Sequence, residues 1–333
     1  MSKVVILSLF ALAILALSAF NKADLPFDRN LSEVLIENGD PKPKHFVNAI
    51  DLDAVKRGEE LVKFGKTTGP NGEKSGYISK YYKCTSCHNT VREDLDLANI
   101  NQDERLNYAI QNNIPYLPAS TLWGMVNKET WYNDDYVKKY GDLVKPAQHN
   151  LEEAIQLCAV ECSQGKALNE WEMESVVHYL WSLQMKMSDL GLMPNEQEML
   201  DIDSIGSKEK IALIKSKYMQ KSPATFVDAP ANKKKGYDYE GRPELGKAIY
   251  ALACQHCHRP NGESDVVLDN AKTTFKWLEN HLNNNDQLSF YQAIRYGTWA
   301  DAGHREYMPR YTQEKMSDQQ VEDLRAYIES QIK

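Results

Sequence analysis

The pattern Cys-x-x-Cys-His occurs twice in this chain and constrains its fold more than any other feature. It covers residues 84–88, where the thiols are Cys84 and Cys87, and residues 254–258, where they are Cys254 and Cys257. Two thiols three positions apart on an incipient helix can reach the two vinyl groups of one porphyrin. The pattern therefore predicts two covalently bound haem c groups, one on each copy.

The histidine that ends each copy separates this interpretation from its alternatives. Cys-x-x-Cys alone also occurs in thioredoxin-like redox pairs and in zinc sites. A zinc site built from both pairs would leave His88 and His258 unexplained. An imidazole next to the second thiol points at the iron, so we expect His88 and His258 to be the proximal iron ligands.

Length, charge and the first residues limit the class of protein. A chain of 333 residues suits two small domains and a connector. Its net charge of −8, with no basic run longer than residues 233–235, argues against nucleic-acid partners. Residues 1–20 combine Lys3 with a long apolar run, which predicts a signal peptide or an N-terminal membrane anchor. Since c-type haem is attached outside the cytoplasm, we expect a periplasmic protein, either soluble or anchored by this segment.

The sequence around each motif resembles the class I cytochrome c domain. Residues 243–250 are similar to that family's first helix, and residues 57–62 repeat the pattern before the first motif. After each motif a capping-box spacing opens an apolar stripe, at residues 169–172 and 317–320. The resemblance implies an all-α fold with two class I cytochrome c-like haem domains. We expect domain 1 over residues 24–184 with a long insert, a connector over 185–234 and domain 2 over 235–333.

The sixth ligand of the second haem is expected from the same resemblance. Class I domains place their axial methionine shortly before the last helix, which is the position of Met308. Thioether ligation opposite histidine raises the reduction potential of the iron. Met316 is the competing candidate, although a methionine at the start of the last helix is more often core filling.

The first haem has no methionine followed by proline at the corresponding place. Cys158 and Cys162 lie there instead, just before the closing helix. Iron accepts a thiolate readily, but a pair of buried structural cysteines or a local disulfide satisfies the same spacing. From the residues alone both interpretations stay open, with Met125 and His149 as further candidate ligands.

Residues 151–168 resemble the segment that supplies an axial cysteine in two-haem thiosulfate dehydrogenases. The resemblance implies that Cys158 is the axial ligand, while Cys162 takes the place of a serine near the substrate. That family binds its dianionic substrate partly through upstream arginines, yet no arginine lies between Arg105 and Arg242. Positive charge is left to lysines, namely Lys138, Lys139, Lys145 and Lys166. Cys162 and Lys166 are the candidate catalytic residues.

These ligands predict electron flow from the first haem to the second. A small anionic reductant, such as a sulfur oxyanion, would give electrons at the first haem. The second haem would pass them to a redox partner, a soluble cytochrome or a membrane complex. The alternative is a carrier subunit of a respiratory complex without substrate chemistry. The sequence gives no specific sign of a two-haem peroxidase.

The insert of the first domain also holds an aromatic cluster that could line a pocket, bind a partner or pack the insert's own core. Its members are Trp123, Trp131, Tyr132, Tyr136 and Tyr140.

Overall fold

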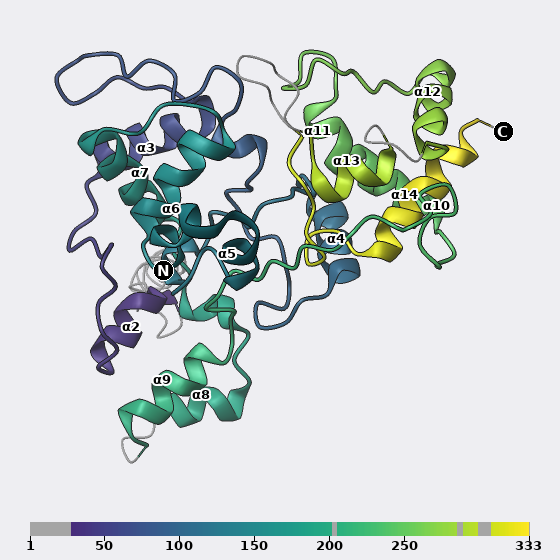
Figure 1. The fold of residues 1–333 in the computed structure, drawn as a ribbon. Helices are drawn as coiled ribbons and strands as arrows, with labels where there is room; N and C mark the ends of the chain where they lie inside the picture. Colours follow the sequence, from purple (N-terminus) through teal and green to yellow (C-terminus); the bar gives the residue numbers. More distant parts are fainter. Residues whose placement is uncertain (1–27, 202–204, 285–288, 299–307, 333) are drawn as a thin grey trace, which may run out of the picture.

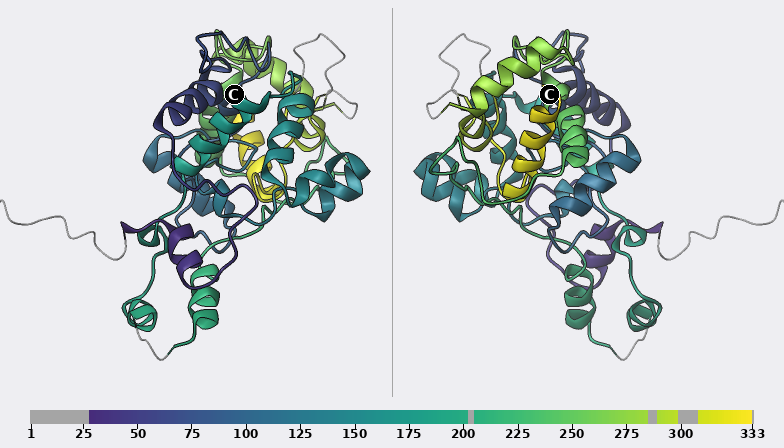
Figure 2. Two further views of the ribbon diagram at one scale, coloured as in Figure 1. Left: turned by 90° about the vertical axis from the view of Figure 1, so that its left-hand side faces the viewer. Right: turned by 90° about the vertical axis from the view of Figure 1, so that its right-hand side faces the viewer.

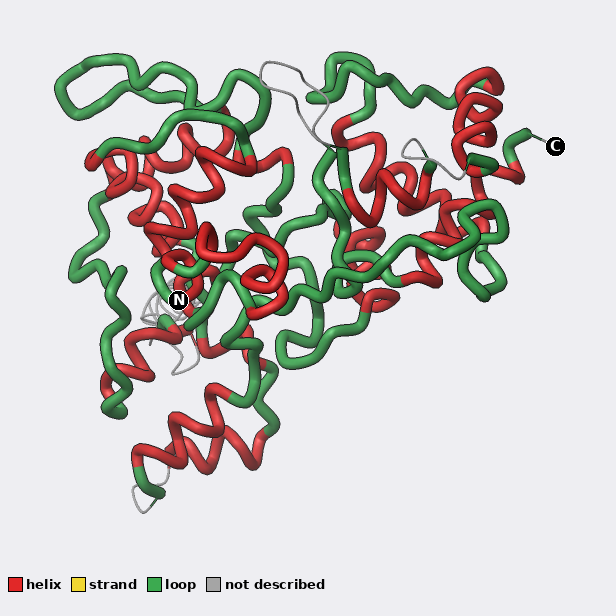
Figure 3. The backbone as a smooth tube through the Cα atoms, viewed as in Figure 1, coloured by secondary structure: helices red, strands yellow, loops and turns green. Residues whose placement is uncertain are grey.

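The structure is a computed structural model that describes residues 28–201, 205–284, 289–298 and 308–332. Helices and loops make up this part of the chain, and its described residues form isolated β-bridges but no β-strand (Figure 3). The all-α fold expected from the sequence is therefore confirmed. The predicted signal segment, residues 1–20, lies outside the described residues. Among those residues, none of the helices combines the length and apolar character needed to cross a membrane.

Two crossing helices organise the first part of the chain. Its helices are α2 (Leu31–Glu37), α3 (Leu52–Phe64), α4 (Gln102–Asn112), α5 (Asp134–Tyr140), α6 (Leu151–Leu157) and α7 (Glu170–Ser182). α3 packs against α7 (Figure 1). The contact depends on Gly58, because a Cβ atom there would lie 1.9 Å from the backbone oxygen of Ser175. Only glycine allows so close an approach of two helices.

α7 begins as the sequence predicted. The Asn169 side chain accepts a hydrogen bond from the N–H of Glu172, and the Glu172 carboxylate accepts one from the N–H of Asn169. This reciprocal pair satisfies two backbone donors that the first turn of a helix leaves free. The expected apolar stripe of α7 is buried, and it comprises Met173, Val176, Val177, Leu180 and Trp181.

The last part of the chain repeats this crossing. Its helices are α10 (Pro243–Ile249), α11 (Gln255–Cys257), α12 (Lys272–Leu282), α13 (Phe290–Tyr296) and α14 (Asp318–Ser330). A Cβ atom on Gly246 in α10 would lie 1.9 Å from the backbone oxygen of Asp323 in α14. α14 opens with the predicted capping box between Ser317 and Gln320. In each part of the chain, the helix before the Cys-x-x-Cys-His motif thus crosses the helix after it at a glycine. This similarity supports the predicted repeat, while the domain boundaries stay a prediction.

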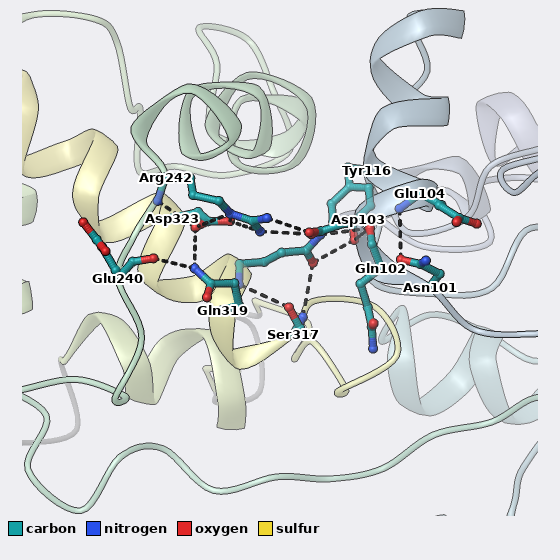
Figure 4. Close-up of polar contacts among 11 residues, drawn as sticks. Asn101, Gln102, Asp103, Glu104, Tyr116, Glu240, Arg242, Ser317, Gln319 and Asp323 are labelled. Atoms are coloured by element: carbon teal, nitrogen blue, oxygen red, sulfur yellow. Dashed lines mark hydrogen bonds and ion pairs between the residues drawn. The ribbon is translucent and has the colours of Figure 1, made fainter.

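α4 belongs to the predicted insert of the first domain but packs into the core of the second. Leu106, Ala109 and the nearby Tyr116 are buried in one cluster with Ile249 and Leu324. Figure 4 shows the polar side of the same contact. Here Arg242 lies between Asp103 of α4, at 2.7 Å, and Asp323 of α14, at 2.6 Å. The insert therefore ties the two parts of the chain together.

The connector has a helical part and an extended part. α8 (Pro194–Asp201) and α9 (Ser207–Lys215) form a hairpin that projects beside α2 (Figures 1 and 2). Ile214 and Tyr218 bury against Leu31 and Leu35 of α2. Further along, the N–H and hydroxyl of Thr225 both donate to the Glu314 carboxylate. The connector thus contacts both parts of the chain.

Candidate haem sites

The second motif follows α10 through a π-helical turn, Tyr250–Cys254. The N–H of His258 donates to the backbone oxygen of Cys254 at 2.9 Å, which closes the motif as one helical turn. Nδ1 of His258 lies 2.8 Å from the backbone oxygen of Val266. A backbone carbonyl that holds Nδ1 fixes the ring and leaves Nε2 for a metal, which is the arrangement typical of iron-binding histidines.

The first motif has the same internal geometry. It begins with a short helical turn, Cys84–Ser86, and the N–H of His88 donates to the backbone oxygen of Cys84 at 2.9 Å. Nδ1 of His88 lies 2.6 Å from the backbone oxygen of Ser120. Burial lowers the pKa of His88, so the ring stays neutral at physiological pH. A neutral, oriented imidazole is what ligation to iron requires.

The motif cysteines are free to form thioether bonds. All four are free thiols. Burial raises the pKa of Cys84 to about 11 and that of Cys254 to about 12. Each pair of thiols is partly buried, and an oriented histidine accompanies it. On these observations the residues present fit one covalently bound haem at each motif.

Hydrogen bonds of its backbone fix the position of Met308. Its N–H donates to Oγ1 of Thr298 at 2.7 Å, and its backbone oxygen accepts from the N–H of Thr298 at 3.1 Å. Gly297 has φ +68°, and a Cβ atom there would lie 2.3 Å from the Met308 oxygen. Met308 packs at the edge of the core that also contacts Cys254, whereas Met316 is 1% exposed inside that core. Ligation by Met308 stays a prediction.

The segment Cys158–Cys162 forms a π-helical turn after α6. Two hydrogen bonds connect it to the segment that precedes the first motif. The N–H of Lys166 donates to the oxygen of Ile78 at 2.8 Å, and the Ser79 hydroxyl donates to the oxygen of Ser163 at 2.5 Å. Ala159 is buried in the core against which Cys84 packs. Cys158 and Cys162 therefore lie beside the first motif, and their role as the distal segment of a haem stays a prediction.

The two thiols of this turn influence each other. Both are free thiols in the structure. The neighbouring Cys162 thiol, together with burial, raises the pKa of Cys158, whereas Cys158 and the Tyr132 hydroxyl lower the pKa of Cys162 against the effect of burial. Axial ligation by Cys158 stays a prediction, as do the alternatives Met125, which is buried in the first core, and His149, which is exposed.

The aromatic side chains of the insert divide into two groups. Trp131 packs against the first core and Trp123 against the core of α2 and the connector. The tyrosines instead form a row that starts at Cys162. Ring centroids lie 4.8 Å apart between Tyr132 and Tyr136, and 6.0 Å apart between Tyr136 and Tyr140. The insert therefore both fills cores and lines one side of the distal segment.

Lys166, a candidate catalytic residue, is committed to an ion pair. Its Nζ lies 2.7 Å and 2.5 Å from the two carboxylate oxygens of Glu172. The Glu172 side chain is fully buried and also caps α7. In this position Lys166 neutralises a buried carboxylate, and its catalytic role remains untested.

The two motifs touch each other. Nε2 of His256, inside the second motif, lies 3.1 Å from the backbone oxygen of Thr85, inside the first. The Cys257 thiol lies 3.8 Å from the backbone oxygen of Ser86. The Ser86 hydroxyl in turn donates to the Glu263 carboxylate at 3.3 Å. Both haem-attachment segments therefore meet along the line where the two parts of the chain join.

A buried charge cluster next to the first motif could not be found from the sequence. Glu93 lies 2.6 Å from Nζ of Lys315 and 3.3 Å from the Arg105 guanidinium. Burial opposes ionisation of Glu93, but the two cations hold its pKa well below the usual range. These residues line a cavity of about 70 Å³ together with Ser120, whose backbone oxygen holds His88. Each residue comes from a different segment of the chain, so no local sequence pattern predicts the cluster.

A helical fold with a Cys-x-x-Cys-His turn and an oriented histidine defines a c-type haem protein. Consistent with this class, residues 243–331 match the family model described as Cytochrome c. The chain therefore contains a cytochrome c domain, which binds haem c covalently and transfers electrons to a redox partner. No curated protein and no solved structure matches the chain.

Proposed function

We propose that the chain is a dihaem c-type cytochrome that takes electrons from a small reductant at the first haem. The electrons pass through the second haem to a soluble cytochrome or a respiratory acceptor. In this proposal Cys84 and Cys87 hold the first haem and His88 is its proximal ligand. The second haem has its own complete set of residues in the second motif.

The contact between the two motifs is the observation that carries this proposal. Thr85 and His256 are hydrogen-bonded, and Cys257 lies against Ser86. Residues between the paired thiols lie next to the porphyrin edge that those thiols bind. Direct contact between two such segments therefore supports two haem groups close enough to exchange electrons without a further carrier.

The direction of flow follows from the proposed sixth ligands, Cys158 and Met308. Bound haem iron supplies one-electron chemistry, at low potential with a thiolate ligand and at higher potential with a thioether. The location of Cys158 and Cys162 beside the first motif supports a sulfur ligand there. Under this assignment the chain accepts electrons at the first motif and delivers them from the second.

The number of haem groups and the first sixth ligand can be tested directly. A pyridine haemochrome assay with mass spectrometry should give two haem groups per chain. Electron paramagnetic resonance should show a low-spin thiolate signal that Cys158→Ala removes and Cys162→Ser preserves. One haem per chain contradicts the dihaem proposal. A signal that follows Cys162 moves the ligand by one helical turn, and a signal that survives both substitutions rules out a thiolate.

Turnover separates the proposed enzyme from the alternative, a carrier subunit of a respiratory complex. Steady-state oxidation of thiosulfate and sulfite can be followed with an artificial electron acceptor. Catalytic oxidation of either anion supports the proposed reductant class. A protein that exchanges electrons with a partner cytochrome but oxidises neither anion is a carrier.

A periplasmic location is part of the proposal, and fractionation of cells that produce the full chain checks it.

A further inference from the structure

Of the four lysines that the sequence offered as positive charge near the first motif, one is not neutralised by an ion pair. Three of the four lysines expected to offer positive charge are each paired with a carboxylate. These pairs are Lys138 with Asp135 at 2.9 Å, Lys145 with Asp142 at 2.6 Å and Lys166 with Glu172 at 2.5 Å. Lys139, which is exposed, has no carboxylate within 4.0 Å among the described residues. Its charge is therefore available to a ligand.

Arg310 brings a second cation to the same place. The Lys139 ammonium lies 5.2 Å from the ring centre of Phe226, and the Arg310 guanidinium lies 5.4 Å from it. Both cations also lie 5.9 Å from the ring centre of Tyr140. Partial burial, and then the charge of Arg310, lower the pKa of Lys139. Two like charges over the same pair of rings repel each other, and an anion between them would remove that cost.

The Arg310 guanidinium has an unused donor. Its Nη2 donates to the backbone oxygen of Tyr296 at 2.9 Å, whereas its Nη1 is buried and has no partner in the part of the chain described. A buried charged donor without an acceptor is costly. Asp228, the one carboxylate that raises the pKa of Lys139 among the described residues, accepts a hydrogen bond from the Tyr296 hydroxyl at 2.6 Å. Nη1 of Arg310 is therefore available to donate to a bound anion.

The row of tyrosines connects this pair of cations to the distal segment of the first motif. Tyr140, under both cations, stacks on Tyr136, and Tyr136 contacts Tyr132. After burial, the Cys162 thiol is the group that most raises the pKa of Tyr132, so these two side chains are neighbours. The cations and the two thiols of the distal turn therefore lie at opposite ends of one aromatic wall.

We infer that Lys139 and Arg310 together form a binding site for a small dianionic oxyanion, at the end of the tyrosine row that is farther from Cys162. Two cations match the charge of a dianion, and the guanidinium offers a planar fork to its oxygens. The rings of Phe226 and Tyr140 exclude water from one side of the two cations, so less water competes with the anion for them. Arg310 comes from the last part of the chain, two residues after Met308. It supplies the arginine that the stretch between Arg105 and Arg242 lacks.

This site deepens the proposed function, on which its link to the first haem rests. It names the reductant class as a sulfur oxyanion small enough to lie between one lysine and one arginine. It also makes substrate binding depend on both parts of the chain, because Arg310 lies two residues after Met308.

Binding of a redox-inert anion tests the site without requiring turnover. The probe is sodium sulfate, titrated calorimetrically into the full-length holoprotein at low ionic strength with sodium chloride as the reference. We expect saturable binding at one site in the wild type. Arg310→Gln and Lys139→Gln should each weaken it by about tenfold or more, since each removes one of two charge-assisted contacts. The control is Lys138→Gln, the neighbour on α5 that is already paired with Asp135, and this change should leave binding as in the wild type.

The outcomes separate the site from the proposed function. Binding with no oxidation of thiosulfate or sulfite retains the site and removes the oxidase. Oxidation that persists unchanged in both variants, with no sulfate binding, removes the site and retains the oxidase. If wild type binds no sulfate but Arg310→Gln shifts a haem midpoint potential in its absence, the guanidinium holds a haem propionate and the inference is wrong. The surface change Lys139→Gln keeps the test decisive should Arg310→Gln fail to fold.

Discussion

The imidazole Nε2 of His256 lies 3.1 Å from the backbone oxygen of Thr85. Each residue occupies a variable position inside its own Cys-x-x-Cys-His motif, so this one bond joins the two haem-attachment turns directly. Burial lowers the pKa of His256, which keeps its ring neutral in the contact. Together with the contact of Cys257 and Ser86, the bond holds the two motifs at a fixed separation, on which electron exchange would depend in the proposed dihaem protein.

Removal of this bond should slow electron exchange within the protein. His256→Ala deletes the partner of the Thr85 oxygen and leaves a gap between the motifs, at a stability cost of about 1–2 kcal/mol. We expect a lower rate of electron transfer between the two haem groups, with midpoint potentials close to those of the wild type. Pulse radiolysis followed by optical detection of each haem measures the rate. His281→Ala is the control, because Nδ1 of that ring lies 2.8 Å from the backbone oxygen of Trp277, one turn earlier in α12. An unchanged rate in His256→Ala would show that electrons take another route.

Asp94 should make stability depend on pH in an unusual direction. Burial raises the pKa of Asp94 to about 6, and the charge of Glu93 adds to this effect, whereas Arg105, Lys315 and Lys128 oppose it. The folded state therefore holds the Asp94 proton more tightly than the unfolded chain does. Its contribution to stability is present below about pH 4 and is lost as the pH rises through about 6.

Asp94→Asn should remove this loss. The variant should gain about 1–3 kcal/mol over the wild type near pH 8 and almost nothing near pH 4. Chemical unfolding of the holoprotein at both pH values measures the difference. Glu93→Gln is the matched comparison, because it leaves Arg105 and Lys315 buried without their anion and should cost about 3 kcal/mol near pH 8. A gain that is equal at both pH values would contradict ionisation of Asp94 as the cause.

The two helix crossings should respond alike to a single methyl group. In Gly58→Ala and Gly246→Ala the new Cβ atom would meet a backbone oxygen at 1.9 Å, so the helices must separate. We expect a loss of about 3 kcal/mol or more in each variant. Gly191→Ala serves as the control. It lies in the left-handed region, with φ +61° and ψ +35°, and has open space around it, so the strain should cost only about 1 kcal/mol. Thermal unfolding measures these losses. If the control variant loses as much stability as Gly58→Ala and Gly246→Ala, the two helix crossings are not tightly packed.

The sequence predicted local structure well because its signals are local. The motif turns, the capping boxes at Asn169 and Ser317 and the apolar stripe of α7 all depend on residues a few positions apart. The packing of α4 into the second core was not predicted, because Leu106 and Tyr116 carry no mark of which core they join. The same limit applies to the site formed by Lys139 and Arg310. Only the fold brings α5 next to the segment after Met308, so an arginine missing from one stretch of sequence can be supplied by another.

Met308 and Met316 offer a final test, because they should separate ligation from packing. Met316 is 1% exposed in the second core, so its removal leaves a cavity. Met308 lies at the edge of that core, and its backbone is fixed by Thr298 and the close approach of Gly297. We therefore expect Met308→Ala to abolish the weak near-infrared band of a sulfur-ligated ferric haem and to lower the potential of the second haem. Met316→Ala should instead cost about 2–5 kcal/mol of stability and keep both the band and the potential. Magnetic circular dichroism and potentiometric titration of the two variants measure these properties. If the band disappears in Met316→Ala and survives in Met308→Ala, the sixth ligand is Met316. In that case Met308 no longer connects the segment that carries Arg310 to the second haem.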